Sequence, residues 1–211
     1  FNGWPQTGRD RALRAEDEAR REASTAREVS DFLVELFEVS DPGEARGNSI
    51  TAREILDQGA QRVQQELGEQ PTVQARLMHT IGAVYQNLGL YDQADTLVES
   101  ALRLREAALG TEDPEVAESL NNLALLYRSI AEYAKAEPLC RNAMEIRRKM
   151  LGEEHPDYAK SLNNLADLYQ SMDDYAKAEP LYAQAIRIGK RIRGEEHPDY
   201  AASLDGLADV Y

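Results

Sequence analysis

The chain has 211 residues, 42% of them hydrophobic, which is enough apolar content for a packed core and excludes a disordered chain. Its net charge of -14 at pH 7 disfavours binding to nucleic acid or to an anionic membrane surface, because both require positive charge. The only cysteine, Cys140, excludes a disulfide within the chain, and no run of about 18 apolar residues is present that would span a membrane. The single cysteine fits a reducing compartment, so we expect a cytoplasmic location.

The N-terminal third is predicted to differ from the rest of the chain. Residues 1–9 match nothing that follows and are expected to be a disordered arm or a remnant outside the fold. Residues 10–39 contain no helix breaker and predict one long helix, whose apolar second half is expected to cap the fold. Its alanine-rich first half is either a solvated extension or a weak dimer seam. Residues 40–70 are expected to form a loop followed by a helix of a degenerate repeat.

From residue 71 onward the sequence repeats every 42 residues. The segment from Glu154 to Ala159 returns at 196–201 unchanged, and Ser119-Leu-Asn-Asn-Leu-Ala124 returns at 161–166, also unchanged. A fixed period of this size predicts stacked structural repeats, here at about 71–112, 113–154 and 155–196, with a partial repeat at 197–211. We expect the last segment to be covered by a continuing chain or a partner, because Leu204, Leu207 and Val210 have no second helix to cover them.

Each repeat predicts two helices. In the 112–152 unit, Asp113 and Pro114 form an N-cap followed by proline at the first helical position, and apolar residues then follow at helical spacing. A break near residues 130–132 precedes a second helix from about Tyr133 to Met150, which Gly152 ends. No segment alternates with period two, so the predicted fold is all-α.

The repeat resembles the tetratricopeptide repeat in its long 42-residue form, as in kinesin light chains. The residues that carry the resemblance are Leu120, Leu123, Ala124, Tyr127, Tyr133, Ala136 and Ala143, with their equivalents 42 residues later. The resemblance implies antiparallel helix hairpins stacked into a right-handed solenoid. One departure is the turn between the helices, where the family's glycine stands at Gly89 but is replaced by Ala131 and Asp173. We therefore expect tighter or mildly strained turns at these two positions.

Residues 23–63 carry a second resemblance. They are similar to the junction that precedes the C-terminal repeat domain of large bacterial serine/threonine protein kinases. The resemblance implies a regulatory or sensor fragment of a bacterial signalling protein, which in a membrane-anchored kinase would be extracytoplasmic. The sequence itself contains none of the kinase motifs.

A polar stripe on the first helix of each repeat is the candidate binding site. The tetratricopeptide resemblance implies that this stripe lines a concave groove. Asparagine side chains there offer both a donor and an acceptor to an extended peptide backbone. The alternative is that some of these amides bond to the neighbouring repeat. The candidate groove residues are Arg76, His79, Asn87, Asn121, Asn122, Arg128, Lys160, Asn163, Asn164, Asp167 and Gln170.

No residue pattern points to catalysis, a metal or a cofactor. His155 and His197 are separated by a whole repeat, no pair has zinc-ligand spacing, and Cys140 occupies an apolar repeat position. We therefore predict a non-catalytic scaffold that binds a protein or peptide segment. The alternative is a self-association module, a homodimer formed through the N-terminal helix or the open C-terminal repeat edge.

Overall fold

The computed structural model describes residues 51–194 and 198–210, and every regular element in these ranges is a helix. The helices are α2 (Ala52–Glu66), α3 (Pro71–Asn87), α4 (Tyr91–Leu109), α5 (Pro114–Ser129), α6 (Tyr133–Leu151), α7 (Pro156–Ser171), α8 (Tyr175–Arg193) and α9 (Pro198–Ala208). The all-α prediction is therefore confirmed for this part of the chain. The predictions for residues 1–9 and 10–39, and for the loop at 40–49, lie outside the described residues.

The chain divides into two compact units, with the boundary between Leu77 and Met78 inside α3. In the first unit, α2 begins at a capping box: Thr51 Oγ1 accepts from Glu54 N–H, while the Glu54 carboxylate accepts from Thr51 N–H. The side-chain amide of Gln74 in α3 donates to the Val63 carbonyl in α2 at 3.0 Å. This bond satisfies a buried carbonyl and fixes the start of α3 against α2.

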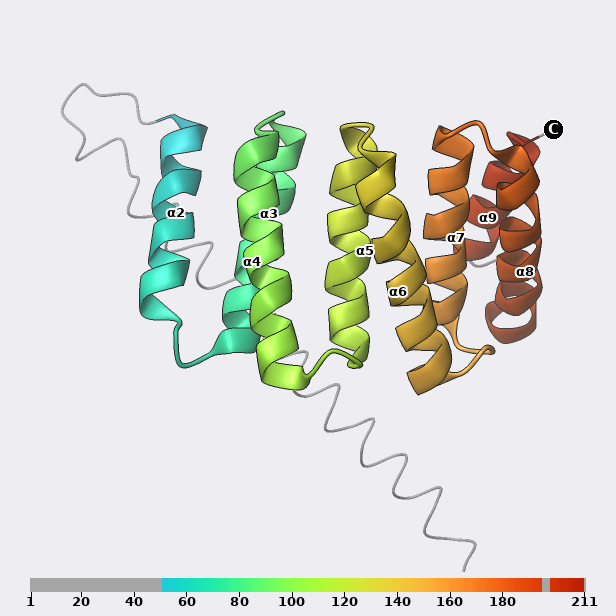
Figure 1. Ribbon diagram of the computed structural model, residues 1–211, viewed down its shortest axis with the longest axis horizontal. Coiled ribbons are helices and arrows are strands. Elements are labelled where there is room, and N and C mark those ends of the chain that lie inside the picture. The colour runs from blue at the N-terminus through green and yellow to red at the C-terminus, as the bar shows by residue number, and fades with distance from the viewer. Residues whose placement is uncertain (1–50, 195–197, 211) are drawn as a thin grey trace, which may run out of the picture. The chain divides into compact units, whose positions relative to one another are not determined.

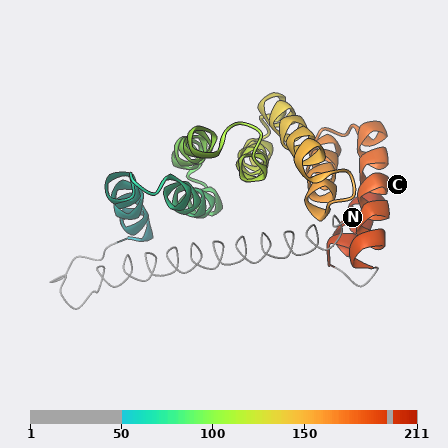
Figure 2. The same ribbon diagram turned by 90° about the horizontal axis from the view of Figure 1, so that it is seen from below.

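The second unit, from Met78 onward, is a stack of helix hairpins in chain order, in which each helix from α4 to α8 packs against the next one (Figure 1). Contacts also join α5 to α7 and α7 to α9, so the first helices of successive repeats touch each other. Figure 2 shows the helices of this unit closer to end-on, in the same order. This is the arrangement that the 42-residue period predicted.

Helix boundaries follow from local sequence. Asp113 Oδ1 accepts from Glu115 N–H at 2.8 Å, and His155 Nδ1 accepts from Asp157 N–H at 3.1 Å, so both residues cap the proline-initiated helices that follow. Gly110, Gly152 and Gly194 end the second helices with φ of 84°, 90° and 81°. These values favour glycine, which explains its return at this position in every repeat.

Small residues allow the paired helices to approach closely. An added Cβ at Gly82 would lie 2.7 Å from Val98 Cγ2, and the corresponding Ala124 and Ala166 are no more than 1% exposed. The Cys140 thiol is also buried, and burial raises its pKa to about 12. It is therefore a protonated packing residue at neutral pH, as the sequence predicted, rather than an activated nucleophile.

The turns between paired helices confirm the expected strain. Gly89 has φ of 73°, and the residues that replace it in the next two repeats, Ala131 and Asp173, have φ of 59° and 58°. A side chain other than glycine is disfavoured there, because its Cβ approaches the backbone.

Candidate functional site

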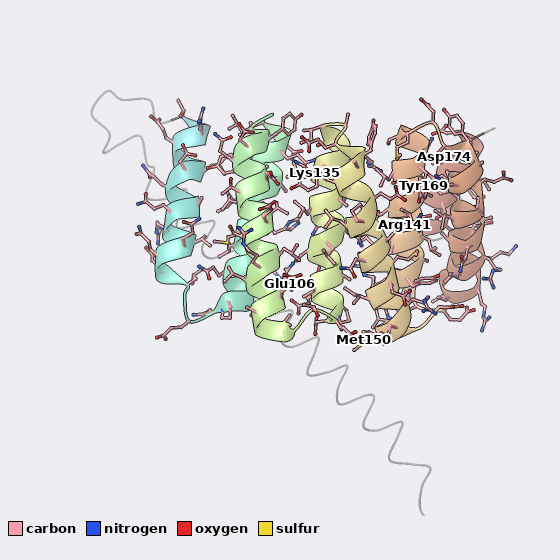
Figure 3. All side chains as sticks on the ribbon, viewed as in Figure 1. Glu106, Lys135, Arg141, Met150, Tyr169 and Asp174 are labelled. Carbon is pink, nitrogen blue, oxygen red and sulfur yellow. The ribbon has the colours of Figure 1, made fainter. Side chains whose placement is uncertain are left out.

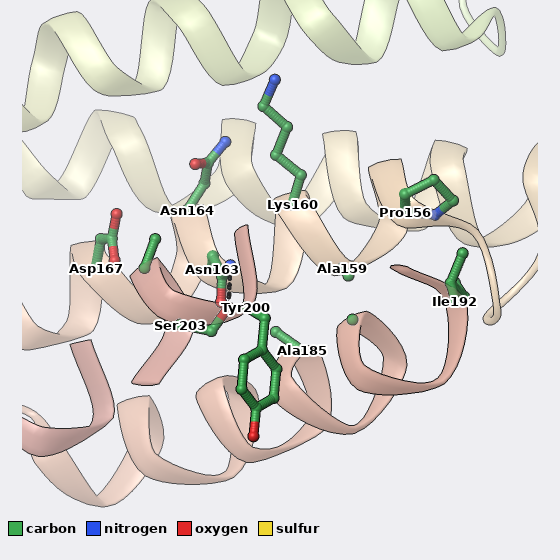
Figure 4. Close-up of a pocket in the computed structure, with 12 residues that line it drawn as sticks. Pro156, Ala159, Lys160, Asn163, Asn164, Asp167, Ala185, Ile192, Tyr200 and Ser203 are labelled. Carbon is green, nitrogen blue, oxygen red and sulfur yellow. Dashed lines mark hydrogen bonds between the residues drawn. The ribbon is translucent and has the colours of Figure 1, made fainter. Parts of the chain in front are cut away.

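Four of the five candidate groove residues of the third repeat line one pocket, together with residues that the sequence did not single out; the fifth, Gln170, is not part of the lining. Its volume is about 230 Å³, and it lies between α7, α8 and α9 (Figure 4). The α7 side contributes four predicted groove residues, Lys160, Asn163, Asn164 and Asp167. The remaining lining residues are Pro156, Ala159, Ala185, Gly189, Ile192, Tyr200, Ala202 and Ser203.

Asn121 and Asn163 connect neighbouring repeats. Asn121 Nδ2 donates to Ser161 Oγ at 3.2 Å, and Asn163 Nδ2 donates to Ser203 Oγ at 2.7 Å. The Oδ1 atoms of both asparagines are buried and have no hydrogen-bond partner in the described part of the chain. Both amides therefore make the inter-repeat bonds that were the alternative interpretation.

The two asparagines differ in exposure. Asn121 is only 3% exposed, so the expectation that it lines the groove surface is wrong. The reason is that the side chain turns into the contact between α5 and α7. Asn163 is half-buried and borders the pocket while making the same kind of bond. Asn122 and Asn164 are also half-buried, and Asn164 lines the pocket.

Arg128 and Asp167 pair with each other across neighbouring repeats, with Arg128 Nη1 3.1 Å from Asp167 Oδ2. The Tyr182 hydroxyl donates to Asp167 Oδ1 at 2.6 Å and contacts Gln170 Oε1 at 2.7 Å. Burial, followed by the bond to Asp167, raises the pKa of Tyr182, so its hydroxyl remains a proton donor. These groups form a fixed polar wall rather than freely rotating side chains.

The remaining predicted residues are spread along α3 and α7. Lys160 and Asn87 are exposed, and His79 is half-buried with its Nδ1 inaccessible to solvent and without a hydrogen-bond partner among the described residues. Burial, reinforced by Arg105, lowers the pKa of His79, so its imidazole is neutral at pH 7. Arg76 is half-buried and belongs to the first unit.

A second set of polar contacts joins the second helix of one hairpin to the first helix of the next hairpin. Arg141 of α6 and Tyr169 of α7 lie beside each other (Figure 3), and the Tyr169 hydroxyl donates to Glu137 at 2.7 Å. The corresponding Tyr127 hydroxyl donates to Glu99 at 3.1 Å. These bonds join one hairpin to the next, so the tyrosines that recur every 42 residues serve stacking.

Within residues 51–194 and 198–210, no group of three or more His, Cys, Asp or Glu side chains could hold a metal ion. None of the helices described is long and apolar enough to cross a membrane.

Comparison with known families identifies the family of the chain. The tetratricopeptide repeat model matches residues 73–139, 128–190 and 161–211, so the chain belongs to the tetratricopeptide repeat family. The family is generally non-catalytic and serves protein–protein interaction, which defines this chain as an interaction scaffold. No curated protein matches the sequence.

Solved structures agree with this assignment. The chain is similar to the crystal structure of BtubC (BKLC) from P. vanneervenii, with 25% identity and a TM-score of 0.67 over 96% of this chain and 81% of that one. It is also similar to the nearly identical TPR-like repeats of a putative kinesin light chain from Podosopora anserina. That match has 28% identity and a TM-score of 0.61 over 75% of each chain.

Sequence reasoning missed the α8 and α9 side of the pocket, notably Gly189 and Ser203. A signal was present, since Ser203 continues the series Ser119 and Ser161, while Gly189 interrupts the series Arg105 and Arg147. A residue that breaks such a series at a buried position is informative, because a smaller side chain there leaves space that the other repeats fill.

Proposed function

We propose that the second unit is a non-catalytic scaffold that binds an extended peptide segment, with one peptide side chain entering the pocket between α7, α8 and α9. The pocket itself carries this proposal. At about 230 Å³ it is smaller than the ~300–1,000 Å³ typical of small-molecule sites, so it suits a single side chain. Lys160 and Asn164 lie at the same pocket, where they can contact the peptide backbone beside that side chain.

A displayed random-peptide library selected on the chain, followed by fluorescence anisotropy on the enriched peptides, tests the proposal. The double variant Lys160→Ala/Asn164→Ala should weaken binding about tenfold or more, since loss of a binding hot spot costs at least ~1 kcal/mol. The matched control is Arg187→Ala/Asn142→Ala, which removes a cation and an amide from exposed positions outside the pocket. The control should bind within about twofold of the wild type.

Failure to enrich any peptide, or equal loss in both double variants, would contradict the proposal. Sedimentation of the same variants separates peptide binding from self-association. A change of mass in Lys160→Ala/Asn164→Ala with no peptide binding in the wild type would favour a homodimer instead. The signalling context, a sensor fragment of a bacterial kinase, stays a prediction from residues 23–63.

A further inference from the structure

The first two inter-repeat junctions of the second unit are each filled by an arginine. Arg105, near the end of α4, donates to Ser119 Oγ in α5 at 2.6 Å. Arg147, near the end of α6, donates to Ser161 Oγ at 3.0 Å and to the Asp157 carbonyl at 3.2 Å, both in α7. The two arginines are only 2% and 5% exposed, so each guanidinium lies inside the stack.

The third junction has the same frame without the arginine. The position 42 residues after Arg147 is Gly189, and the serine of the series is Ser203 in α9. A Cβ added at Gly189 would meet nothing within 4 Å, and the pocket is lined by both Gly189 and Ser203. The pocket therefore occupies the place that an arginine side chain fills in the preceding junctions.

We propose that this pocket binds an arginine side chain of the peptide partner, in the position that Arg105 and Arg147 occupy in their own junctions. This inference rests on the proposed function and names the chemistry of the side chain that enters. The internal arginines are the template: they show that this frame accommodates a guanidinium with its stem lying between the helices.

The lining of the pocket suits both parts of an arginine. Ala159, Ala185 and Ile192 provide apolar walls for the three methylenes. Ser203 and Asn163 supply the polar part of the lining, and Ser203 corresponds to Ser161, whose Oγ accepts from Arg147. A planar guanidinium with several fixed donors matches this set better than an ammonium, which concentrates its charge at one point.

One charge opposes the proposed ligand and provides a way to test it. Asp157 and Glu118 act on Arg147 electrostatically in the second junction, and Lys160 is the residue that corresponds to Glu118 at the third. Lys160 is exposed, and its ammonium end points away from Ser203 (Figure 4). Lys160→Ala removes a polar contact to the peptide backbone, whereas Lys160→Glu keeps a polar side chain that can accept from backbone N–H groups. Because it also restores the acidic residue, Lys160→Glu should strengthen binding of a cation.

The probes are three capped tripeptides, acetyl-Gly-X-Gly-amide, in which X is arginine, lysine or citrulline, the neutral counterpart of arginine. They are titrated into the ¹⁵N-labelled chain and followed by NMR, with saturation expected near millimolar concentration. The arginine peptide should shift the Asn163 side-chain amide and the Ser203 amide. It should bind about fivefold or more tightly than the citrulline peptide, since charge-assisted bonds are roughly twice as strong as neutral ones. A similar preference is expected over the lysine peptide, because an ammonium lacks the planar set of fixed donors.

Two variants complete the test. Gly189→Arg places a guanidinium in the pocket from within the chain and should abolish the arginine-peptide shifts, whereas Gly189→Ala should retain them. Lys160→Glu should tighten arginine-peptide binding about threefold or more, through an added attraction of the order of a surface pair. If Gly189→Arg does not fold, Lys160→Glu remains an independent test.

Equal affinities for the three peptides, or shifts that persist in folded Gly189→Arg, would overturn the arginine assignment. An unchanged or weaker arginine affinity in Lys160→Glu would also overturn it. The proposed function has a separate readout. Library peptides that bind the wild type and lose affinity in Lys160→Ala/Asn164→Ala, yet contain no required arginine, would support groove binding and reject only the arginine.

Discussion

The second and third junctions of the stack are built on the same frame and differ at the buried position that Arg147 fills in the second junction. Around Arg147, guanidinium, serine hydroxyl, asparagine amide and helix carbonyl fill the contact between α6 and α7. Around Gly189, the serine and asparagine remain bonded to each other at 2.7 Å, but a pocket replaces the arginine. The comparison shows that the bond between serine and asparagine is common to both junctions, whereas the space beside Gly189 is available to a ligand.

The largest expected effect comes from making the second junction like the third. Arg147→Gly should lower the free energy of unfolding by about 3 kcal/mol, because it leaves a cavity, removes two buried hydrogen bonds and adds a helical glycine. The adjacent Arg148→Gly is the control. Arg148 is exposed and pairs with Glu145 on the surface, so we expect a loss of about 1 kcal/mol. Urea unfolding measures both variants, and equal losses would show that Arg147 does not hold the junction.

The two asparagines that connect neighbouring repeats should also contribute unequally to stability, with the larger contribution again at the second junction. Asn121→Ala should cost about 2 kcal/mol, because the side chain is buried and its bond to Ser161 is lost without replacement. Asn163→Ala should cost about 1 kcal/mol or less, since water can enter the adjoining pocket and bond to Ser203. The difference is read from the same urea curves, and a larger cost at Asn163 would contradict the comparison.

These two amides show where sequence reasoning succeeded and where it stopped. The 42-residue period and the capping signals at Asp113 and Gly152 were sufficient for the helices, because both arise from local backbone chemistry. The position of Asn121 was not predictable from its place in the repeat. Groove-facing and neighbour-facing directions differ only by a side-chain torsion, and that torsion is set by Ser161, 40 residues away. Gly189 would have been informative if the interruption of the arginine series had been considered.

Two glycines at the third junction should respond oppositely to alanine. An added Cβ at Gly206 would lie 2.6 Å from the Tyr182 ring, which is nearly fully buried. Gly206→Ala should therefore destabilise the chain by about 1–2 kcal/mol. Gly189→Ala meets open space and should stabilise it by about 1 kcal/mol through helix propensity. Thermal unfolding compares the pair, and destabilisation by Gly189→Ala would show that the pocket is filled rather than open.

The smallest effect concerns pH at the first junction, where His79 occupies the position of Asn121. Its folded-state pKa is lowered from 6.5, first by burial and then by Arg105. The unfolded chain therefore binds the proton more strongly, so stability is complete above pH 6.5 and falls as the pH decreases below it. The expected slope is at most about 1.4 kcal/mol per pH unit. His79→Asn should flatten the stability curve between pH 6.5 and 5, and an unchanged curve would assign the acid sensitivity to other groups.

The central claim is that the third junction is an arginine site without its arginine. Its most direct test is the free energy of unfolding of Gly189→Arg compared with Gly189→Ala, which has nearly the same helix propensity but no side chain to fill the pocket. The account predicts that the arginine variant is more stable than the alanine variant by about 1 kcal/mol or more, through buried charge-assisted bonds. An arginine variant that is equal to or less stable than Gly189→Ala would contradict it.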